Sequence, residues 1–374
     1  MRIAVDIRPL MEGKTTGVEV YLINLLDNLF KLDNRNEYIL FANSFRKIDL
    51  PEFKYPNVKT VVTRYPNKLF NFFQKLGFPK IEKIVGGIDL FFSPHWRVLA
   101  IKKSTRLVVT FHDLFFEIMP DFFTWRRRIW HWFMNYKGAA VRADKIIAVS
   151  ENTKRDLAEI YGIAKEKIEV VYPGVHNSPQ PSLTLREGVP PLKVRGGEGE
   201  LYFLYFGTFE PRKNIETVLA AYEQYYKDSE VKRPLILAGS HGWKTNIMIP
   251  VQLKNKITVR LNVTEQEKRQ LYQNAFAFIF PSYYEGFGFP ILEAASYSLP
   301  VIASYNSSLA EIGRDFVFFA NPFRPSGFAR AMLDLEQDNG LYADFAGKGY
   351  QAASNFKWQI AAEKTLRLFQ ETAI

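Results

Sequence analysis

Short apolar runs alternate with amphipathic helical patterns along almost the whole chain, and no other feature limits the possible fold as strongly. In the helical patterns apolar residues recur on one face, as Tyr21, Leu25 and Leu29 do. Strands that alternate with helices predict mainly parallel sheets covered by helices on both faces. The runs that we interpret as strands are RIAVDI, YILFAN, KTVVTR, DLFFSP, RLVVTF, KIIAVS and IEVVYP, then LYFLYFGT, PLILAGS, ITVRLNV, AFAFIFP, LPVIAS and DFVFFA.

The chain divides into two such regions. At 374 residues it is longer than one ordinary hydrophobic core supports. Residues 177–200 are rich in Pro and Gly and lack apolar periodicity, which is typical of an interdomain linker. We therefore predict two doubly wound α/β domains around one cleft, at 1–176 and 201–356, followed by a terminal helix at 357–374.

Composition narrows the class of protein and its partners. The chain has no Cys and no apolar run of membrane-spanning length, and it opens on a strand rather than a signal peptide. We therefore expect a cytoplasmic protein. Its 49 Lys and Arg exceed 39 Asp and Glu, a net charge of +10 that favours anionic partners. We expect no nucleic acid among them, because the sequence shows neither a contiguous basic stripe nor a known binding module.

Residues 274–297, NAFAFIFPSYYEGFGFPILEAASY, carry the strongest local signal for a ligand site. The apolar run predicts a buried strand, and Pro290 suits the first turn of a helix. Glu285 then lies in the connecting loop and Glu293 on the opening turn, at the sheet edge where α/β folds bind nucleotides. A helix start favours phosphate, and carboxylates accept hydrogen bonds from hydroxyls. The stretch predicts a sugar-nucleotide site; the simpler interpretation is a Gly-rich turn with one solvated glutamate.

A second half-site follows the first strand of the second region, in GTFEPRKN. Gly207 permits close approach of a backbone, and Arg212 and Lys213 supply two cations. Asn214 can cap a helix whose N-terminus adds positive potential. Together these residues predict a clamp for a pyrophosphate, although a solvated Arg–Lys pair ahead of a helix would give the same pattern.

Five stretches together resemble glycosyltransferase family 4. EGFGFPILE with its flanks FPSYYEG and LPVIAS, GTFEPRKN, and LILAGSHGW are similar to the donor site of that family. DIRPLMEGKTTGVEVYLINLL and TFHDLFFEIMP are similar to its glycine loop and its His-Asp segment. The resemblance covers nearly the whole chain in order. It implies the GT-B fold, with two Rossmann-like domains and a C-terminal helix that crosses back to the first.

The resemblance also implies roles for single residues. Glu285 would bind hydroxyls of the transferred sugar, and Glu293 those of the ribose. Arg212 and Lys213 would neutralise the diphosphate leaving group, and His112 would lie near the transferred sugar. The other residues expected to contact the donor are Gly17, Gly207, Phe287, Gly288 and Phe289.

One stretch departs from the family pattern. VRLNV at 259–263 stands where relatives usually have an aromatic residue and a glycine, so the base of the donor stays open between GDP-mannose, which we prefer, and a UDP-hexose. Family members retain the anomeric configuration and need no divalent metal. The chain has no Asp-x-Asp motif, and we expect neither a metal nor a cofactor.

The histidines have structural alternatives. From spacing alone, the His112–Asp113 pair is as often a structural cap as a functional group, and only the resemblance favours function. We interpret His95, His131, His176 and His241 as packing or surface residues, with His95 the one that could reach the cleft.

Residues 64–83 and 122–137 mix Lys and Arg with aromatic residues. Exposed faces of this kind are costly in water unless they are covered. Either the aromatic side chains pack on the sheet and leave Arg126–Arg128 solvated, or the segments bind an anionic membrane surface. The second interpretation fits a transferase that acts on a lipid-linked acceptor.

The resemblance thus implies a retaining, metal-independent glycosyltransferase. It would move a hexosyl group, preferably mannosyl, from a nucleotide-diphosphate sugar to a glycan or lipid-linked acceptor in polysaccharide, lipopolysaccharide or glycolipid synthesis. Such an enzyme would be cytoplasmic or peripheral on the inner face of the cell membrane. The alternatives are a GT-B enzyme that epimerises a UDP-sugar, which should lack the EGFGFP loop, and a non-enzymatic protein that binds anions or nucleic acid.

Overall fold

The computed structural model describes residues 1–11, 17–96, 99–175, 201–243 and 247–373, and the backbone of 193–194 and 197–198. These residues form two units, residues 1–174 with 357–374, and residues 175–356. The predicted linker and His176 lie outside the described residues, apart from a short antiparallel pair of β8 (Lys193–Val194) and β9 (Gly197–Glu198).

Seven strands form the sheet of the first unit, and all seven were predicted from apolar runs. They are β1 (Arg2–Asp6), β2 (Glu37–Asn43), β3 (Val58–Thr63), β4 (Leu90–Ser93), β5 (Arg106–Phe111), β6 (Lys145–Ala148) and β7 (Ile168–Val170). The sheet is parallel throughout, in the order β3-β2-β1-β4-β5-β6-β7. In the register of β1, Val5 pairs with Leu40 on one side and Phe92 on the other.

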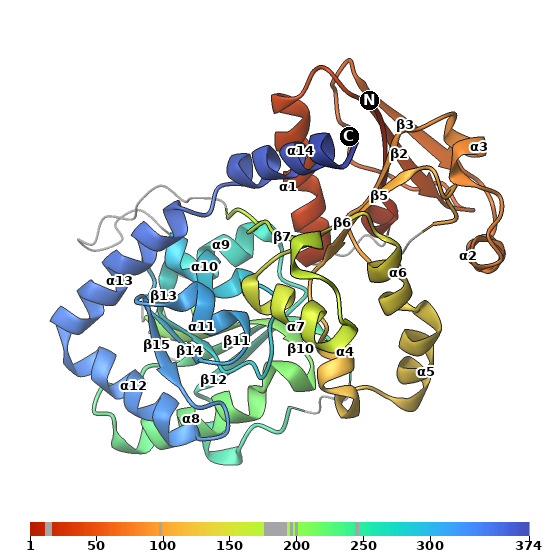
Figure 1. Cartoon of the computed structure of the whole chain (residues 1–374). Helices are drawn as coiled ribbons and strands as arrows, with labels where there is room; N and C mark the ends of the chain where they lie inside the picture. Colours follow the sequence, from red (N-terminus) through yellow and green to blue (C-terminus); the bar gives the residue numbers. More distant parts are fainter. Residues whose placement is uncertain are drawn as a thin grey trace. The chain divides into compact units, whose positions relative to one another are not determined.

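Helices cover both faces of this sheet (Figure 1). They are α1 (Gly17–Leu32), α2 (Asn67–Lys75), α3 (Ile81–Val85), α4 (Phe115–Ile118), α5 (Trp125–Met134), α6 (Tyr136–Arg142), α7 (Glu151–Tyr161) and α14 (Trp358–Ala373). On one face α14 packs against α1, and Phe369 contacts Phe92 of β4 at 5.1 Å between ring centroids. On the other face Phe70, Ile81 and Leu157 join the buried strand residues in one hydrophobic cluster. The last helix of the chain therefore belongs to the first unit.

Six strands form the sheet of the second unit, and again each was predicted. They are β10 (Tyr202–Phe209), β11 (Leu235–His241), β12 (Ile257–Leu261), β13 (Ala275–Phe280), β14 (Val301–Ser304) and β15 (Val317–Ala320). They are parallel and lie in the order β12-β11-β10-β13-β14-β15. The strand order thus reverses at β10, so the carboxyl ends of β10 and β13 form the crevice where open α/β sheets bind ligands.

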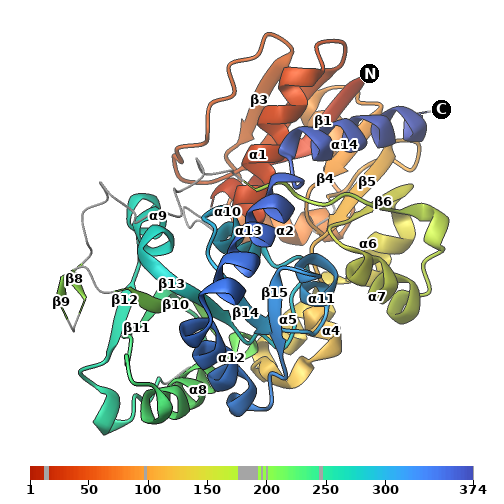
Figure 2. The ribbon, with the colours of Figure 1, turned by 90° about the vertical axis from the view of Figure 1, so that its left-hand side faces the viewer.

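The helices of the second unit lie on opposite sides of its sheet (Figure 2). They are α8 (Ile215–Asp228), α9 (Glu265–Asn274), α10 (Phe289–Ser296), α11 (Ser308–Gly313), α12 (Pro325–Gln337) and α13 (Asn339–Ser354). α8 packs against α12, and α10 packs against α13. Figures 1 and 2 show α8 and α12 on one side of the strands and α9 and α10 on the other.

The helix caps partly follow the sequence predictions. Ser150 caps α7 by accepting a hydrogen bond from the Thr153 N–H at 3.0 Å, and Thr264 forms a capping box with Glu267 at α9. The predicted side-chain cap by Asn214 is wrong. Asn214 takes a left-handed conformation before α8, and its amide donates to the carbonyls of Pro281 at 3.0 Å and Pro322 at 2.8 Å. It ties together the loops after three strands instead of capping one helix.

Candidate active site

The two half-sites predicted in the second region meet at one edge of its sheet. Arg212 and Lys213 follow β10 in a short 3-10 helix (Pro211–Lys213), and Glu285 follows β13, the neighbouring strand. The main chains of the two loops are joined directly, because the Tyr283 N–H donates to the Arg212 carbonyl at 2.9 Å. Sheet order therefore unites segments that lie far apart in the sequence.

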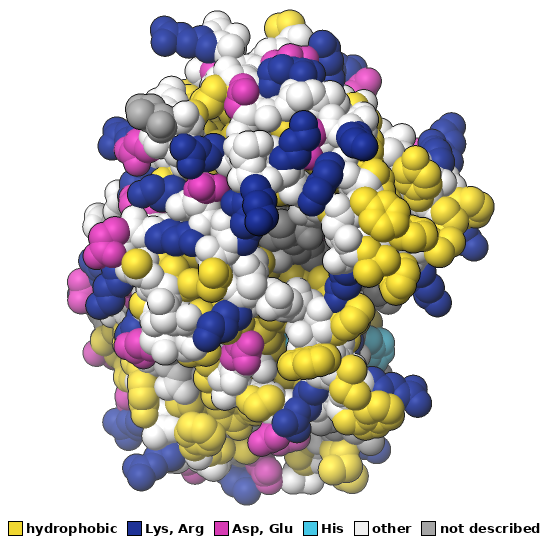
Figure 3. Space-filling model, turned by 45° about the vertical axis from the view of Figure 1, so that its right-hand side comes forward, with side chains coloured by type: hydrophobic (Ala, Val, Ile, Leu, Met, Phe, Trp, Pro, Cys, Tyr) yellow, Lys and Arg dark blue, Asp and Glu magenta, His cyan; other side chains and the backbone are white. Residues whose placement is uncertain are grey.

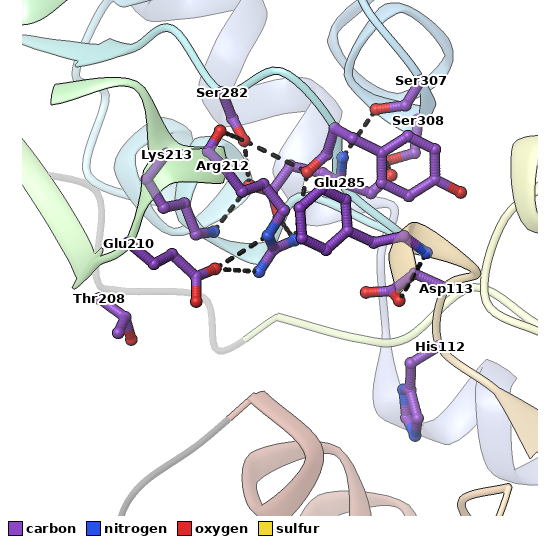
Figure 4. Close-up of polar contacts among 12 residues, drawn as sticks. His112, Asp113, Thr208, Glu210, Arg212, Lys213, Ser282, Glu285, Ser307 and Ser308 are labelled. Atoms are coloured by element: carbon purple, nitrogen blue, oxygen red, sulfur yellow. Dashed lines mark hydrogen bonds and ion pairs between the residues drawn. The ribbon is translucent and has the colours of Figure 1, made fainter. Parts of the chain in front are cut away.

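Glu285 is the centre of a buried ionic cluster (Figure 4). Its Oε1 accepts hydrogen bonds from Lys213 Nζ at 2.7 Å and Ser282 Oγ at 2.6 Å, and its Oε2 lies 3.1 Å from Arg212 Nη1. The residue is only 6% exposed. Burial by itself would raise the pKa of Glu285, but the charges of Arg212 and Lys213 outweigh it and hold the pKa below its usual value. The carboxylate fixes both cations in place.

A second carboxylate, that of Glu210, balances the charge of Arg212. Glu210 Oε1 lies 2.9 Å from Arg212 Nε and 2.7 Å from Nη2, so one carboxylate oxygen accepts from both nitrogens in a charge-assisted contact. Glu210 is 4% exposed, and sequence reasoning gave it no role although it stands inside GTFEPRKN. Two cations and two carboxylates thus form one charge-neutral group.

The loop that carries Glu285 is held by the start of α11. The Glu285 N–H donates to Ser307 Oγ at 2.8 Å, and Ser308 Oγ donates to the Glu285 carbonyl at 2.9 Å. Ser307 itself has φ 54° and ψ −137°, a sparsely populated conformation of the kind that concentrates at functional sites. No local sequence signal pointed to these two serines.

Glycine is required where this loop enters α10. Gly288 has φ 94°, and a Cβ there would lie 2.8 Å from Leu309 Cδ2. The left-handed residue directs the chain into α10, whose N-terminus carries partial positive charge. Phe287 and Phe289, both of which were expected to contact the donor, flank Gly288. Their ring centroids lie 5.1 Å apart.

Two further glycines let β11 approach β10 closely. Gly239 pairs with Gly207 in the register, and a Cβ on Gly239 would lie 1.8 Å from the Gly207 carbonyl oxygen. A Cβ on Gly242 would lie 2.2 Å from the Phe209 carbonyl oxygen. Gly207, which was expected to approach the donor, is partly exposed at this edge. The glycines of LILAGSHGW therefore shape the wall beside the ionic cluster.

Glu293 has partners of its own. Because α10 begins at Phe289, Glu293 is its fifth residue and lies just past the opening turn on which it was predicted. Its Oε1 accepts from Lys268 Nζ at 2.7 Å and its Oε2 from Tyr272 OH at 3.1 Å, both on α9. Sequence reasoning missed both partners, which stand four residues apart on one helix face.

VRLNV ends in a left-handed turn. Asn262 follows β12 with φ 55°, and its N–H donates to the Gly239 carbonyl at 2.8 Å. Asn is the residue other than Gly that most readily takes this left-handed conformation, so Asn262 suits this turn.

In the first unit, His112 follows β5 and is a neutral side chain. Its Nε2 lies 2.9 Å from the Pro94 carbonyl, which can only accept, so Nε2 carries the proton and Nδ1 is the acceptor. Burial lowers the pKa of His112 to about 4, although the Pro94 carbonyl and Asp113 oppose the shift. Tyr21 packs edge-on against the ring at 4.8 Å. Gly17, the other donor contact predicted in this unit, is the exposed first residue of α1.

The other described histidines have mixed environments. His95 is buried, with Nε2 3.3 Å from Asp6 Oδ2, and Asp6 is also paired with Arg8 at 2.7 Å. His131 stacks on Phe116 at 5.0 Å, and His241 is exposed at the end of β11. A surface position thus describes His241, and packing describes His131 together with a contact of 2.6 Å to the Tyr136 hydroxyl, whereas His95 belongs to a buried ionic group with Asp6 and Arg8. Across the parts of the chain that the structure describes, no three or more His, Cys, Asp or Glu side chains converge as metal ligands.

Comparison with known proteins identifies the family and agrees with this fold. Residues 15–178 match the family Glycosyltransferase Family 4, and residues 193–352 match Glycosyl transferases group 1. The O-antigen chain mannosyltransferase B of Escherichia coli is 27% identical over 284 residues, which are 75% of this chain and 72% of that protein.

Two solved structures share the architecture over almost the whole chain. Sucrose-phosphate synthase from Thermosynechococcus elongatus has a TM-score of 0.75 at 19% identity, covering 99% of this chain and 98% of that one. Anabaena HepE in complex with UDP and glucose has a TM-score of 0.69 at 17% identity, covering 99% of each chain. The protein therefore belongs to the family 4, group 1 glycosyltransferases and has their GT-B fold of two Rossmann-like domains.

Proposed function

We propose that this glycosyltransferase moves a mannosyl group, with retention of configuration, from GDP-mannose to a glycan or lipid-linked acceptor in O-antigen or related polysaccharide synthesis. The name of the Escherichia coli relative supports mannose and O-antigen. The observation that carries the site assignment is the buried carboxylate of Glu285, which holds Arg212 and Lys213 together at the carboxyl edge of the sheet. The UDP bound by Anabaena HepE favours a UDP-hexose as the second candidate donor.

Fixed cations suit the chemistry of the leaving group. Breaking the bond between the anomeric carbon and the phosphate oxygen develops negative charge on the diphosphate. Arg212, Lys213 and the N-terminus of α10 can stabilise that charge without reorganising, because tertiary contacts already hold them. Although Glu210 and Glu285 balance their net charge, Arg212 and Lys213 are charged hydrogen-bond donors that need no metal, which supports metal independence.

Glu285 can serve the cations and the sugar at the same time. A carboxylate accepts about four hydrogen bonds, and Lys213, Ser282 and Arg212 use three of them. The remaining acceptor position would take one hydroxyl of the transferred sugar. Glu293, oriented by Lys268 and Tyr272, would accept the ribose hydroxyls, and His112 and Gly17 would contact the donor from the first domain.

Retention would follow from attack on the face that the diphosphate leaves. The acceptor oxygen bonds to the anomeric carbon, the bond to the phosphate oxygen breaks, and that oxygen takes the acceptor proton. Retaining hydrolases instead use a carboxylate nucleophile about 5 Å from a second carboxyl group. Both oxygens of Glu285 are engaged by cations or Ser282, which supports the direct route. Mass spectrometry of protein quenched during turnover should show no covalent sugar; an adduct on any carboxylate would refute this mechanism.

A thermal-shift panel of GDP-mannose, UDP-glucose, UDP-N-acetylglucosamine and ADP-glucose tests the donor. A donor present at 100 times its dissociation constant should stabilise the protein by about 2.7 kcal/mol, and GDP-mannose should act at the lowest concentration. Arg212→Gln should weaken the response, whereas replacing the exposed Arg330, on α12, should not. No stabilisation by any of the four would count against the proposal. Epimerisation of a UDP-sugar without acceptor would favour the epimerase alternative.

An enzyme that uses lipid-linked acceptors would act at the inner face of the cell membrane, where such acceptors are available. Among the described residues, none of the helices is both long and apolar enough to cross a bilayer.

A further inference from the structure

Helix α5 lies on the surface with none of its ten residues buried. Its apolar side chains nevertheless recur at helical spacing, with Trp125, Ile129, Trp132 and Phe133 on one stripe. All four are more than half exposed, and Trp132 reaches 83%. The apolar stripe of an amphipathic helix normally packs against the core. Exposure of the α5 stripe to water is therefore unfavourable unless another molecule covers it.

Helix α2 and the turn after it repeat this arrangement. The helix packs on the first unit through Phe70 and Gln74, while Leu69, Phe72, Phe73 and Leu76 form a stripe of i, i+3, i+4 and i+7 spacing on the outside. Leu69, Phe72 and Leu76 are each more than half exposed. The aromatic side chains of residues 64–83 and 122–137 therefore do not all pack on the sheet, which was one of the two interpretations of these segments.

The two stripes belong to one surface. The Lys75 ammonium, at the end of α2, donates to the Phe133 carbonyl at the end of α5 and lies over the Phe133 ring. Figure 3 shows apolar side chains gathered on this side of the molecule, with Lys and Arg side chains around them. We call this the α2–α5 surface, with Leu69, Phe72, Leu76, Trp125, Ile129, Trp132 and Phe133 as its apolar members.

The charge of the surrounding segments is mostly positive. Residues 64–83 and 122–137 contain nine Lys and Arg and one acidic residue, the buried Glu82, in a chain whose net charge is +10. Asp121, just before the second segment, lies 3.5 Å from Arg128. Arg126–Arg128 of α5 are exposed, as is Lys68 of α2. Trp and Phe prefer the headgroup level of a bilayer, and clustered Lys and Arg attract anionic lipids. A protein partner would have to be acidic and apolar at once, whereas an anionic leaflet combines both properties by its nature.

We propose that the α2–α5 surface docks the enzyme on an anionic lipid bilayer, with both apolar stripes at the headgroup boundary and Arg126–Arg128 against lipid phosphates. The inference deepens the proposed function, since it identifies the part of the first unit that would meet a membrane carrying a lipid-linked acceptor. Two short stripes embed only shallowly, so binding is reversible and depends on both burial and charge.

Sedimentation of the full chain with vesicles tests the proposal. The protein should bind vesicles of phosphatidylcholine mixed with phosphatidylglycerol, bind phosphatidylcholine alone far less, and dissociate as salt increases. The triple change of Arg126, Arg127 and Arg128 to Gln should lower the partition coefficient about 100-fold, because each basic residue at an anionic leaflet contributes roughly a fivefold gain. A matched control changes Lys227, Arg330 and Lys348 to Gln, which removes the same charge from exposed helix positions of the second unit.

The apolar contribution has its own pair of variants. Phe72→Gln with Trp132→Gln should weaken vesicle binding by at least tenfold, while Met248→Gln with Val251→Gln, at equally exposed apolar positions, should not. Unchanged unfolding midpoints would show that each variant keeps its fold. Thermal shift by the donor should be the same in all four variants, so a lost membrane surface and a wrong donor assignment give different results.

Three outcomes would overturn the inference. Protein that sediments with neither kind of vesicle has no such surface, and binding that the arginine and the apolar variants leave unchanged lies elsewhere. A dimer in lipid-free solution that Phe72→Gln with Trp132→Gln dissociates would show that a second copy of the chain covers the α2–α5 surface instead.

Discussion

Lys213 donates a hydrogen bond of 2.7 Å to Glu285 across 72 residues of sequence, from the loop after one strand to the loop after its neighbour. The contact makes one ionic unit out of two motifs that each have a simple alternative interpretation. A solvated Arg–Lys pair and a solvated glutamate would both be exposed, whereas Lys213 is 7% and Glu285 6% exposed. The geometry therefore disfavours both simple interpretations.

The first prediction concerns the loss of this carboxylate. Glu285→Gln keeps the shape of the side chain but leaves Lys213 buried without a charge partner, and breaking a buried pair in this way costs about 3–5 kcal/mol. The free energy of unfolding in urea should fall by about that amount, and stabilisation by the donor should disappear.

Glu293→Gln is the matched control. Its partner Lys268 is 17% exposed at the side chain and Glu293 is 21% exposed, so solvent can replace part of the lost interaction. The stability loss should be clearly smaller than for Glu285→Gln. Equal losses of unfolding free energy in the two variants would show that the Glu285 cluster contributes no more to stability than a partly exposed ion pair does.

A second prediction separates glycines that shape the site from glycines that do not. Gly239→Ala places a Cβ against the Gly207 carbonyl and should destabilise the second unit strongly while abolishing donor binding. Gly347→Ala, inside α13 with no atom within 4 Å of the new Cβ, should stabilise the protein by about 1 kcal/mol. Denaturation of both variants checks the contrast, and a harmless Gly239→Ala would contradict the close approach of β11 to β10.

The third prediction is the titration of His112. Its pKa of about 4 in the folded chain lies below the roughly 6.5 of an unfolded histidine, so the folded state resists protonation. Its contribution to stability is complete above about pH 6.5 and is lost as the pH falls towards 4, because the unfolded chain then binds the proton first. NMR should find His112 protonated at Nε2 and neutral at pH 6; a midpoint near 6.5 would contradict the burial of the ring.

A fourth prediction tests whether His112 acts in turnover. His112→Ala should lower kcat about 100-fold if the ring helps to position the sugar, a loss far larger than the accompanying loss of stability explains. His131→Ala is the control, because His131 packs on Phe116 and contacts the Tyr136 hydroxyl at 2.6 Å, and its loss should lower stability without a comparable loss of kcat. Parallel losses of kcat and stability in His112→Ala would assign His112 a structural role.

Much of the fold could be predicted because its signals are local. A buried strand in a parallel sheet is an apolar run whichever strand lies beside it, so thirteen runs gave thirteen strands. Ser150 and the Thr264–Glu267 box cap helices through contacts within one turn. Asn214 was misread because its side chain reaches Pro281 and Pro322, which no local pattern could indicate.

The sequence by itself thus determined the strands, some helix starts, and Glu285, Arg212 and Lys213 as candidate site residues, since these depend on residue type and short-range spacing. Only the tertiary structure decided their partners. Lys213 donates to Glu285, Lys268 donates to Glu293, and Ser307 accepts from the Glu285 N–H. The tertiary structure also decided that the stripes of α2 and α5 lie outside. Partner choice and exposure depend on sheet order and on which face of a helix meets the sheet, and both are set by contacts between residues far apart in the chain.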